Sequence, residues 1–179
     1  MTAKPPYADD WEGLALVAER LRDDRLRDDP QHVSNGRLTA QDAADRARRS
    51  TALAKQWRAI ADRTAMPWLE ASEAEIRADL QAAVVATAKR AASDPRRAVR
   101  IGRVDQPYSV FAQAVAALAW WQRPYRDGAT MPLIVFIHSI NQMHRAEVAA
   151  RAPKPATAPK PAPAPLPPAP PLRQAALFG

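Results

Sequence analysis

The end of the chain carries side chains that could bind another molecule. Residues 172–179 read LRQAALFG. Leu177 and Phe178 are adjacent apolar side chains at a chain end, where they would reduce solubility unless a partner covers them. Gln174, three residues before Leu177, adds an amide that can donate and accept hydrogen bonds. These residue types predict a binding peptide in which the apolar pair fills a pocket and the amide bonds at its edge.

A proline-rich stretch precedes this peptide, and 10 of the 18 prolines lie between Pro153 and Pro171. Such a composition favours extended polyproline II at about 3.1 Å per residue, so this stretch could reach roughly 60 Å. It predicts a disordered Pro/Ala-rich tail that keeps its tip away from the body. Two other interpretations remain open. The tail could act only in solubility, or PAPLPPAPP, which contains PxxP, could bind a proline-recognising groove.

The Q-x-x-L-F pattern of Gln174, Leu177 and Phe178 resembles the clamp-binding motif of proteins that dock on the bacterial β sliding clamp. This clamp is the ring that holds the replicative polymerase on DNA. The resemblance implies that Gln174 bonds at the pocket edge while Leu177 and Phe178 fill the pocket. Ala175 and Ala176 stand where the family more often has a larger aliphatic residue followed by Ser or Asp, which implies moderate affinity. The resemblance covers five residues and none of the body.

The resemblance implies two functions for the chain. In the first, it is a non-enzymatic clamp ligand that displaces replication and repair factors and inhibits elongation, similar to clamp-targeting toxins of the SocB type. Such toxins are kept scarce by an antitoxin that acts as a proteolytic adaptor, which would be a further partner. In the second, it is an accessory replication, repair or prophage-derived DNA-binding protein that the clamp recruits. A third interpretation, a helical scaffold whose tail has no role, stays open.

Nucleic acid is a second possible partner because basic residues gather at one place. The segment PRRAVRIGR holds four arginines that could contact phosphates or an acidic protein surface: Arg96, Arg97, Arg100 and Arg103. A solvated loop between two helices would have the same composition. Tyr108, Trp120 and Trp121 follow, but each lies in an apolar pattern, so we expect them to pack in the core rather than stack on bases.

We find no residue pattern that predicts catalysis, a metal site or a cofactor. His138 and His144 are six residues apart, so they do not share a helix face as metal ligands would. Ser139 follows His138 directly, and adjacent helix positions point apart, which argues against a nucleophile–base pair. The glycines Gly13, Gly36 and Gly102 are isolated, so no phosphate-binding loop is formed. We therefore expect a non-enzymatic protein without cofactors.

Helix signals recur along the body and predict a mainly α fold, a small bundle of four to five helices. Asp9 or Asp10 caps a first helix that Pro30 and the turn at 34–36 should end. The charged run at 23–29, DDRLRDD, is typical of a solvated helix end. Thr39 with Asp42 predicts a capping box for a second helix that reaches about residue 63, antiparallel to the first.

Three further elements complete the predicted body. Ser72 with Glu75 opens a third helix after a break in which Trp68 should be buried, and Ser109 should cap a fourth. A fifth helix should begin near Pro132 and continue to about residue 150. Its predicted core face follows a 3.6-residue period and consists of Leu133, Phe136, Ile137, Ile140 and Met143. A buried strand at 134–137 is the alternative.

Composition divides the 179 residues into a helical domain at 1–150, a Pro/Ala-rich linker at 151–172 and a clamp-binding peptide at 173–179. The chain has a net charge of +7, of which the tail from Arg151 onward holds +4. Cysteine is absent from the sequence, which excludes disulfides and Cys-based zinc sites. The N-terminus shows no signal peptide, and the longest apolar run, at 133–137, is too short to span a bilayer. We expect a cytoplasmic protein at the nucleoid or replisome, with no membrane partner.

Overall fold

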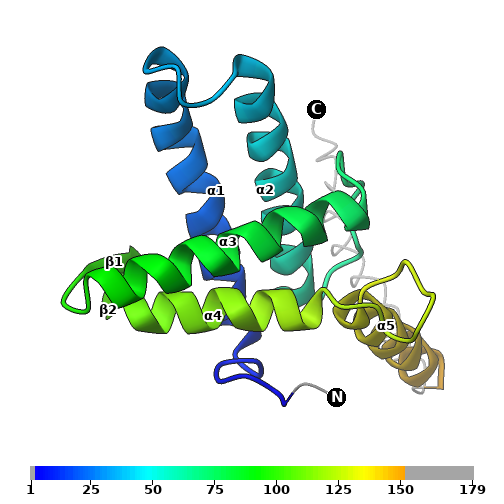
Figure 1. Ribbon diagram of the computed structural model, residues 1–179. Coiled ribbons are helices and arrows are strands. Elements are labelled where there is room, and N and C mark those ends of the chain that lie inside the picture. The colour runs from blue at the N-terminus through cyan, green and yellow to red at the C-terminus, as the bar shows by residue number, and fades with distance from the viewer. Residues whose placement is uncertain (1–2, 152–179) are drawn as a thin grey trace, which may run out of the picture.

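The computed structural model describes residues 3–151, and this part of the chain forms five helices and one two-stranded hairpin (Figure 1). The elements are α1 (Trp11–Ser34), α2 (Ala40–Ala61), α3 (Glu73–Ser93), β1 (Ala98–Ile101), β2 (Val104–Pro107), α4 (Tyr108–Trp121) and α5 (Leu133–Arg151). The predicted mainly α fold is confirmed.

Short polar side chains begin three of the helices, as predicted. The carboxylate of Asp10 accepts the Gly13 amide of α1 at 2.9 Å. Thr39 Oγ1 accepts the Asp42 amide of α2 at 3.0 Å. At α3 the capping box is complete in both directions. These bonds satisfy amides that have no partner within the helix, which fixes where each helix starts.

The prediction that Pro30 ends the first helix is wrong, because α1 continues through it to Ser34. Proline has no amide hydrogen, so the carbonyl of Leu26 receives no helical bond. Pro30 lies on the exposed side of the helix, where water can reach that carbonyl. The turn after α1 forms as predicted, and Gly36 adopts a left-handed φ of +66° there.

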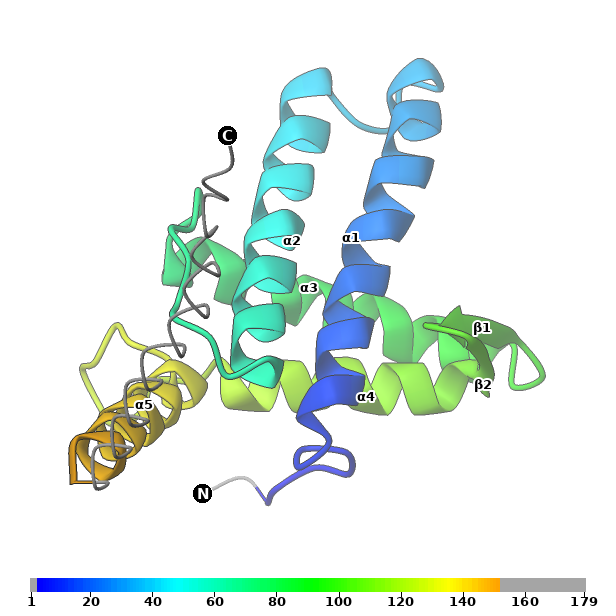
Figure 2. The same ribbon diagram turned by 180° about the vertical axis from the view of Figure 1, so that it is seen from behind.

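Two pairs of helices cross over one core. α1 and α2 lie side by side as an antiparallel hairpin, and α3 and α4 lie across them (Figures 1 and 2). Trp57 of α2 is fully buried at this crossing, as is Leu118 of α4. The other large buried side chains come from both layers: Leu14, Ile60, Ile76, Leu80, Phe111 and Val115.

A buried polar chain joins α2, α3 and the end of α4. Gln122 donates from Nε2 to Oε1 of Gln56, and Gln56 donates from Nε2 to Oε1 of Glu73 at 2.8 Å. Burial raises the pKa of Glu73 against the opposing effect of this bond. Because these two amides are buried, their hydrogen bonds constrain the relative positions of the three helices.

An ion pair also crosses between the layers. Arg25 of α1 pairs with Asp79 of α3, and their side chains are only 11% and 10% exposed. Asp29, near the end of α1, is also buried and accepts Arg46 Nε at 2.9 Å. The charged run at 23–29 is therefore only partly the solvated helix end that we predicted, because two of its residues bond across to other helices.

Two further predictions about this part of the chain are wrong. Trp68 is 87% exposed rather than buried, because the segment between α2 and α3 passes outside the closed core. Ser109 does not cap α4, which begins one residue earlier at Tyr108. The Tyr108 amide instead donates to the Arg97 carbonyl at 2.8 Å. The hydrogen bonds between the two sides of the hairpin therefore continue to the first residue of α4.

The fifth element is a helix and not the alternative strand, and only part of its predicted core face packs against the body. Only Ile134 and His138 of α5 are buried. Ile140 and Met143, two members of the predicted core face, are exposed. Leu133 and Ile137 of that face do pack against the core. The 3.6-residue period thus predicted the helix correctly and its buried face only in part.

Replacing Glu75 with Gln should reveal an ionic contribution to stability that acid removes. Arg48 donates to Glu75 and, with the Ser72 bonds, lowers the pKa of this carboxyl from 4.5 to about 2. A lowered pKa in the folded state stabilises the protein above the unfolded pKa and less as pH falls toward the folded one. We expect E75Q to lower the urea unfolding midpoint at pH 7, by an amount that shrinks between pH 4.5 and about 2.

Glutamine can also serve in a capping box, so this variant removes charge while keeping the cap. The matched control is E70Q, since Glu70 is exposed and pairs with Lys55 at 3.4 Å. Equal and pH-independent losses for both variants would contradict the assignment.

Candidate functional site

The predicted clamp-binding residues Gln174, Leu177 and Phe178 lie outside the described residues, as does nearly all of the predicted linker at 151–172. The described body ends at Arg151, the last residue of α5.

The arginine cluster lies on a β-hairpin, which sequence reasoning missed. β1 and β2 pair antiparallel, with Ile101 opposite Val104. A two-residue loop of Gly102 and Arg103 joins them, and the φ of Gly102 is +58°, as in turns that favour glycine at the first loop position. The alternative of a simple loop between helices is therefore wrong. The signal in the sequence was the alternation of Val99 and Ile101 with polar neighbours before a glycine.

The hairpin brings the four arginines onto one projecting element, but their side chains differ in the partners that they contact. Arg96 and Arg97 precede β1, Arg100 lies on it, and Arg103 lies in the turn. Arg100 pairs with Asp105 on the opposite strand at 3.1 Å. Arg97 lies over the Tyr108 ring, 5.2 Å from its centroid. Among residues 3–151, Arg96 and Arg103 make no ion pair and are exposed, so they carry the available positive charge.

Two arginines on helices extend this basic region, one distant in sequence and one just before the hairpin. Arg20 of α1 donates to the Arg100 carbonyl at 3.2 Å, although it also pairs with Asp24. Arg90 of α3 lies 5.9 Å from the centroid of the Tyr108 ring. The position of Arg20 could not be predicted from the sequence, because only tertiary packing brings α1 to the hairpin.

The aromatic residues near the cluster mostly belong to the core, as expected. Tyr108 and Trp121 are buried, and Trp121 Nε1 donates to the Ala8 carbonyl at 2.8 Å. Trp120 is half-buried, and the Arg123 guanidinium lies 3.6 Å from the centroid of its ring. Burial leaves Tyr108 and Trp121 without a free face on which a base could stack.

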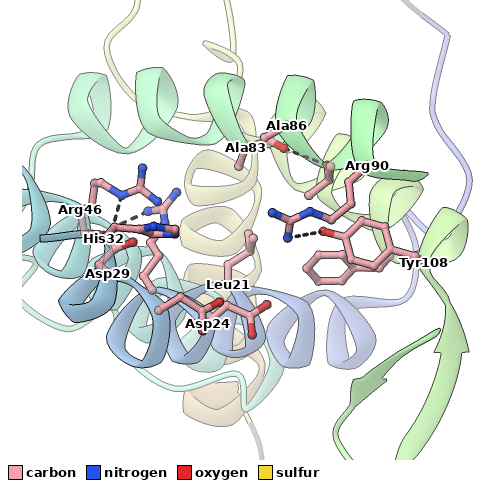
Figure 3. Close-up of a pocket in the computed structure, with 13 residues that line it drawn as sticks. Leu21, Asp24, Asp29, His32, Arg46, Ala83, Ala86, Arg90 and Tyr108 are labelled. Atoms are coloured by element: carbon pink, nitrogen blue, oxygen red, sulfur yellow. Dashed lines mark hydrogen bonds and ion pairs between the residues drawn. The ribbon is translucent and has the colours of Figure 1, made fainter. Parts of the chain in front are cut away.

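A cavity of about 140 Å³ opens between α1, α2, α3 and α4 (Figure 3). Arg46 and Asp29 meet at one end, and Arg90 lies beside Tyr108 at the other. At its rim Arg27 donates to Asp28 at 2.7 Å and lowers the pKa of that carboxyl. Asp29 and Asp28 thus bond to arginines of the chain itself, so this cavity offers no concentrated charge to a ligand.

The histidines and Ser139 occupy separate environments. His138 Nε2 lies 2.9 Å from the Thr64 carbonyl, whereas His144 is exposed. Ser139 donates to the Val135 carbonyl at 2.9 Å. Across the described part of the chain, no cluster of three or more His, Cys, Asp or Glu could hold a metal ion. None of the helices within residues 3–151 combines the length and hydropathy needed to cross a bilayer.

Comparison of the chain with protein-family models, with curated proteins and with solved structures gave no match.

Replacing Gly102 with Ala should destabilise the hairpin that carries the arginines. An L-residue at a left-handed φ costs roughly 1–2 kcal/mol. A Cβ at Gly102 would also lie 3.2 Å from Leu16 Cδ1, so the Leu16 side chain would have to move by a few tenths of an ångström. We expect G102A to lower the free energy of unfolding by about 1–3 kcal/mol, measured by urea denaturation.

Gly128 provides a matched control, since its φ is +74° and a Cβ there would meet no atom within 4 Å. G128A should show the backbone cost alone. A G128A loss as large as the G102A loss would show that the Leu16 contact has no effect.

Proposed function

We propose that this protein is a non-enzymatic ligand of the bacterial β sliding clamp that competes with replication and repair factors for the clamp pocket. One observation carries the proposal, the Q-x-x-L-F sequence of Gln174, Leu177 and Phe178 at the tip of a Pro/Ala-rich stretch. The proposal concerns residues outside the described part of the chain.

The position of the peptide relative to the body supports the proposal. The body's last helix ends at Arg151, and 22 residues separate it from Gln174. A proline-rich spacer of this length can place a peptide tens of ångströms from the body, within reach of a separate protein.

The composition of the peptide is adequate for a transient interaction. Burial of a Leu and a Phe side chain contributes roughly 1.5–3 kcal/mol each. Hydrogen bonds to Gln174 and the backbone contribute about 1 kcal/mol apiece, and ordering of the chain subtracts part of the sum. A dissociation constant of about 1 μM corresponds to about −8 kcal/mol, which these contributions reach near the top of their ranges.

Occupation of a shared pocket explains how the proposed ligand would affect replication. A ligand that fills the pocket excludes polymerases and repair factors by mass action, so an abundant ligand inhibits elongation and acts as a toxin. Control of its abundance then becomes the means of regulation, which an antitoxin acting as a proteolytic adaptor would supply. Its place of action is the replisome in the cytoplasm.

Alanine at Leu177 and Phe178 should abolish clamp binding by the full chain. Loss of both apolar side chains removes about 3–6 kcal/mol of burial, which weakens binding by about 100-fold or more. Surface plasmon resonance with purified clamp measures this effect. L166A is the matched control, because Leu166 belongs to the same tail but lies outside the motif.

Absence of binding by the wild-type chain at about 100 μM clamp would reject the proposal. A second measurement separates an inhibitor from a recruited factor. Overexpression of an inhibitor stops DNA synthesis, and L177A/F178A relieves the arrest. Arrest of DNA synthesis that persists in the double variant would show that the toxicity does not depend on clamp binding.

One observation favours a second candidate, an accessory DNA-binding protein that the clamp recruits. The hairpin presents Arg96 and Arg103 exposed and without ion pairs inside the described residues. Free guanidinium groups on a projecting element can contact phosphates of single- or double-stranded DNA. Arg97 and Arg100 contribute less, since Tyr108 and Asp105 already engage them.

Removal of Arg96 and Arg103 tests this second candidate. If both contact phosphates, R96A/R103A should weaken DNA binding and lower the slope of log K against log salt by up to about 2. Fluorescence anisotropy at several salt concentrations measures both quantities. R145A is the control, because Arg145 lies on α5 at the opposite end of the body from the hairpin (Figure 1). Equal effects of the two variants would show that the hairpin has no specific part in binding.

A further inference from the structure

α5 is held against the body along one side, by apolar packing of Ile134 and by two polar side chains. Ile134 is fully buried, and the His138 ring lies against the Thr64 carbonyl. Gln142, one turn later, donates from Nε2 to the carbonyls of Arg63 at 2.7 Å and Thr64 at 2.9 Å. These contacts are spaced four residues apart, so together they fix the rotation of α5 about its axis.

The side of α5 turned away from these contacts is apolar. Ile140 is 47% exposed and Met143 is 66% exposed. Phe136 and Ile137, at the edge of this strip, are half-buried, because Phe136 stacks on Tyr125 and Ile137 packs against the core. The positions 136, 137, 140 and 143 follow the spacing of three and four residues with which one helix packs against another. α5 also stands apart from the α1–α4 layers (Figures 1 and 2). Within residues 3–151, the middle of this apolar strip, Ile140 and Met143, stays exposed.

We propose that the apolar strip of α5 pairs with the same strip on a second copy of the chain, antiparallel and centred on Ile140. A two-fold axis at Ile140 brings Ile137 of one copy opposite Met143 of the other. A two-fold interface must be complementary to itself, and an apolar strip with Ile140 at its middle meets this requirement. The proposal concerns the body alone and does not depend on clamp binding.

Charge identifies the second copy as the occupant and sets its direction. Glu147 follows Ile140 by seven residues, and Leu133, the first residue of α5, precedes it by seven. The first turn of α5 has no acidic residue, although a helix N-terminus carries positive partial charge. The antiparallel pair places Glu147 of each copy at the first turn of the other. A parallel pair would instead bring the two Glu147 carboxylates together, which is unfavourable.

Cysteine cross-linking of the full chain tests both the contact and its direction, because the native sequence has no cysteine. Disulfides require Cα atoms within about 7 Å. On the proposed axis I140C should form a disulfide dimer on oxidation. M143C alone should not, since the two copies of residue 143 lie about 9 Å apart along the helices. A mixture of I137C and M143C chains should cross-link to each other. V85C is the control, as Val85 is 69% exposed on α3.

Analytical ultracentrifugation of the cysteine-free chain gives the independent measurement. We expect a dimer whose dissociation constant rises on the order of 100-fold in I140D, because burial of an unpaired carboxylate opposes association. V85D should leave it unchanged.

Three outcomes would overturn the proposal. A chain that stays monomeric at about 100 μM would exclude a second copy as the occupant. Cross-linking of I140C and M143C alike would exclude the antiparallel direction. A monomer in which I140D weakens clamp binding would assign the strip to the clamp.

Discussion

The body depends on the crossing of two helix pairs over a single apolar core. Trp57 of α2 and Leu118 of α4, one from each helix pair, are fully buried in this core. Close packing of such side chains leaves little freedom in the angle or position of either pair. The buried chain of Gln122, Gln56 and Glu73 adds direction, because hydrogen bonds tolerate less displacement than apolar contacts.

Four helices, α1 to α4, form most of the core, so the other segments lie at its surface. The segment that carries Trp68 passes over the outer surface, and α5 joins the body through Ile134, His138 and Gln142. The hairpin projects at the other end, where strand pairing continues directly into α4. The available charge of Arg96 and Arg103 and the apolar strip of α5 therefore lie at opposite ends of the body (Figure 1).

The two proposals assign different work to the body and the tail. Under the clamp proposal, Leu177 and Phe178 make the contact with the clamp. The body could then add steric bulk, serve as the part by which the protein's abundance is controlled, or make a second contact. If the body pairs through α5, each assembly carries two copies of the tail. Two linked peptides raise occupancy of a partner with more than one pocket through effective concentration, without any new contact.

Local signals in the sequence determined the helical class and most helix starts. Asp10, Thr39 and Ser72 each bond to an amide three residues ahead, so the information needed to predict these caps lies within one turn. The candidate clamp motif is likewise a property of the sequence, since its three residues act as a linear peptide. Its function stays a prediction of the sequence, because the described part of the chain ends at Arg151.

Tertiary structure alone decided which apolar residues are covered. A period of 3.6 residues in α5 shows that one face is apolar, but the space left by the other helices determines whether that face turns inward. Here His138 and Gln142 bond to backbone carbonyls of the α2–α3 connection, and this requirement turns Ile140 and Met143 outward. The contacts that decided this join residues more than 70 positions apart, a distance over which a local pattern carries no information.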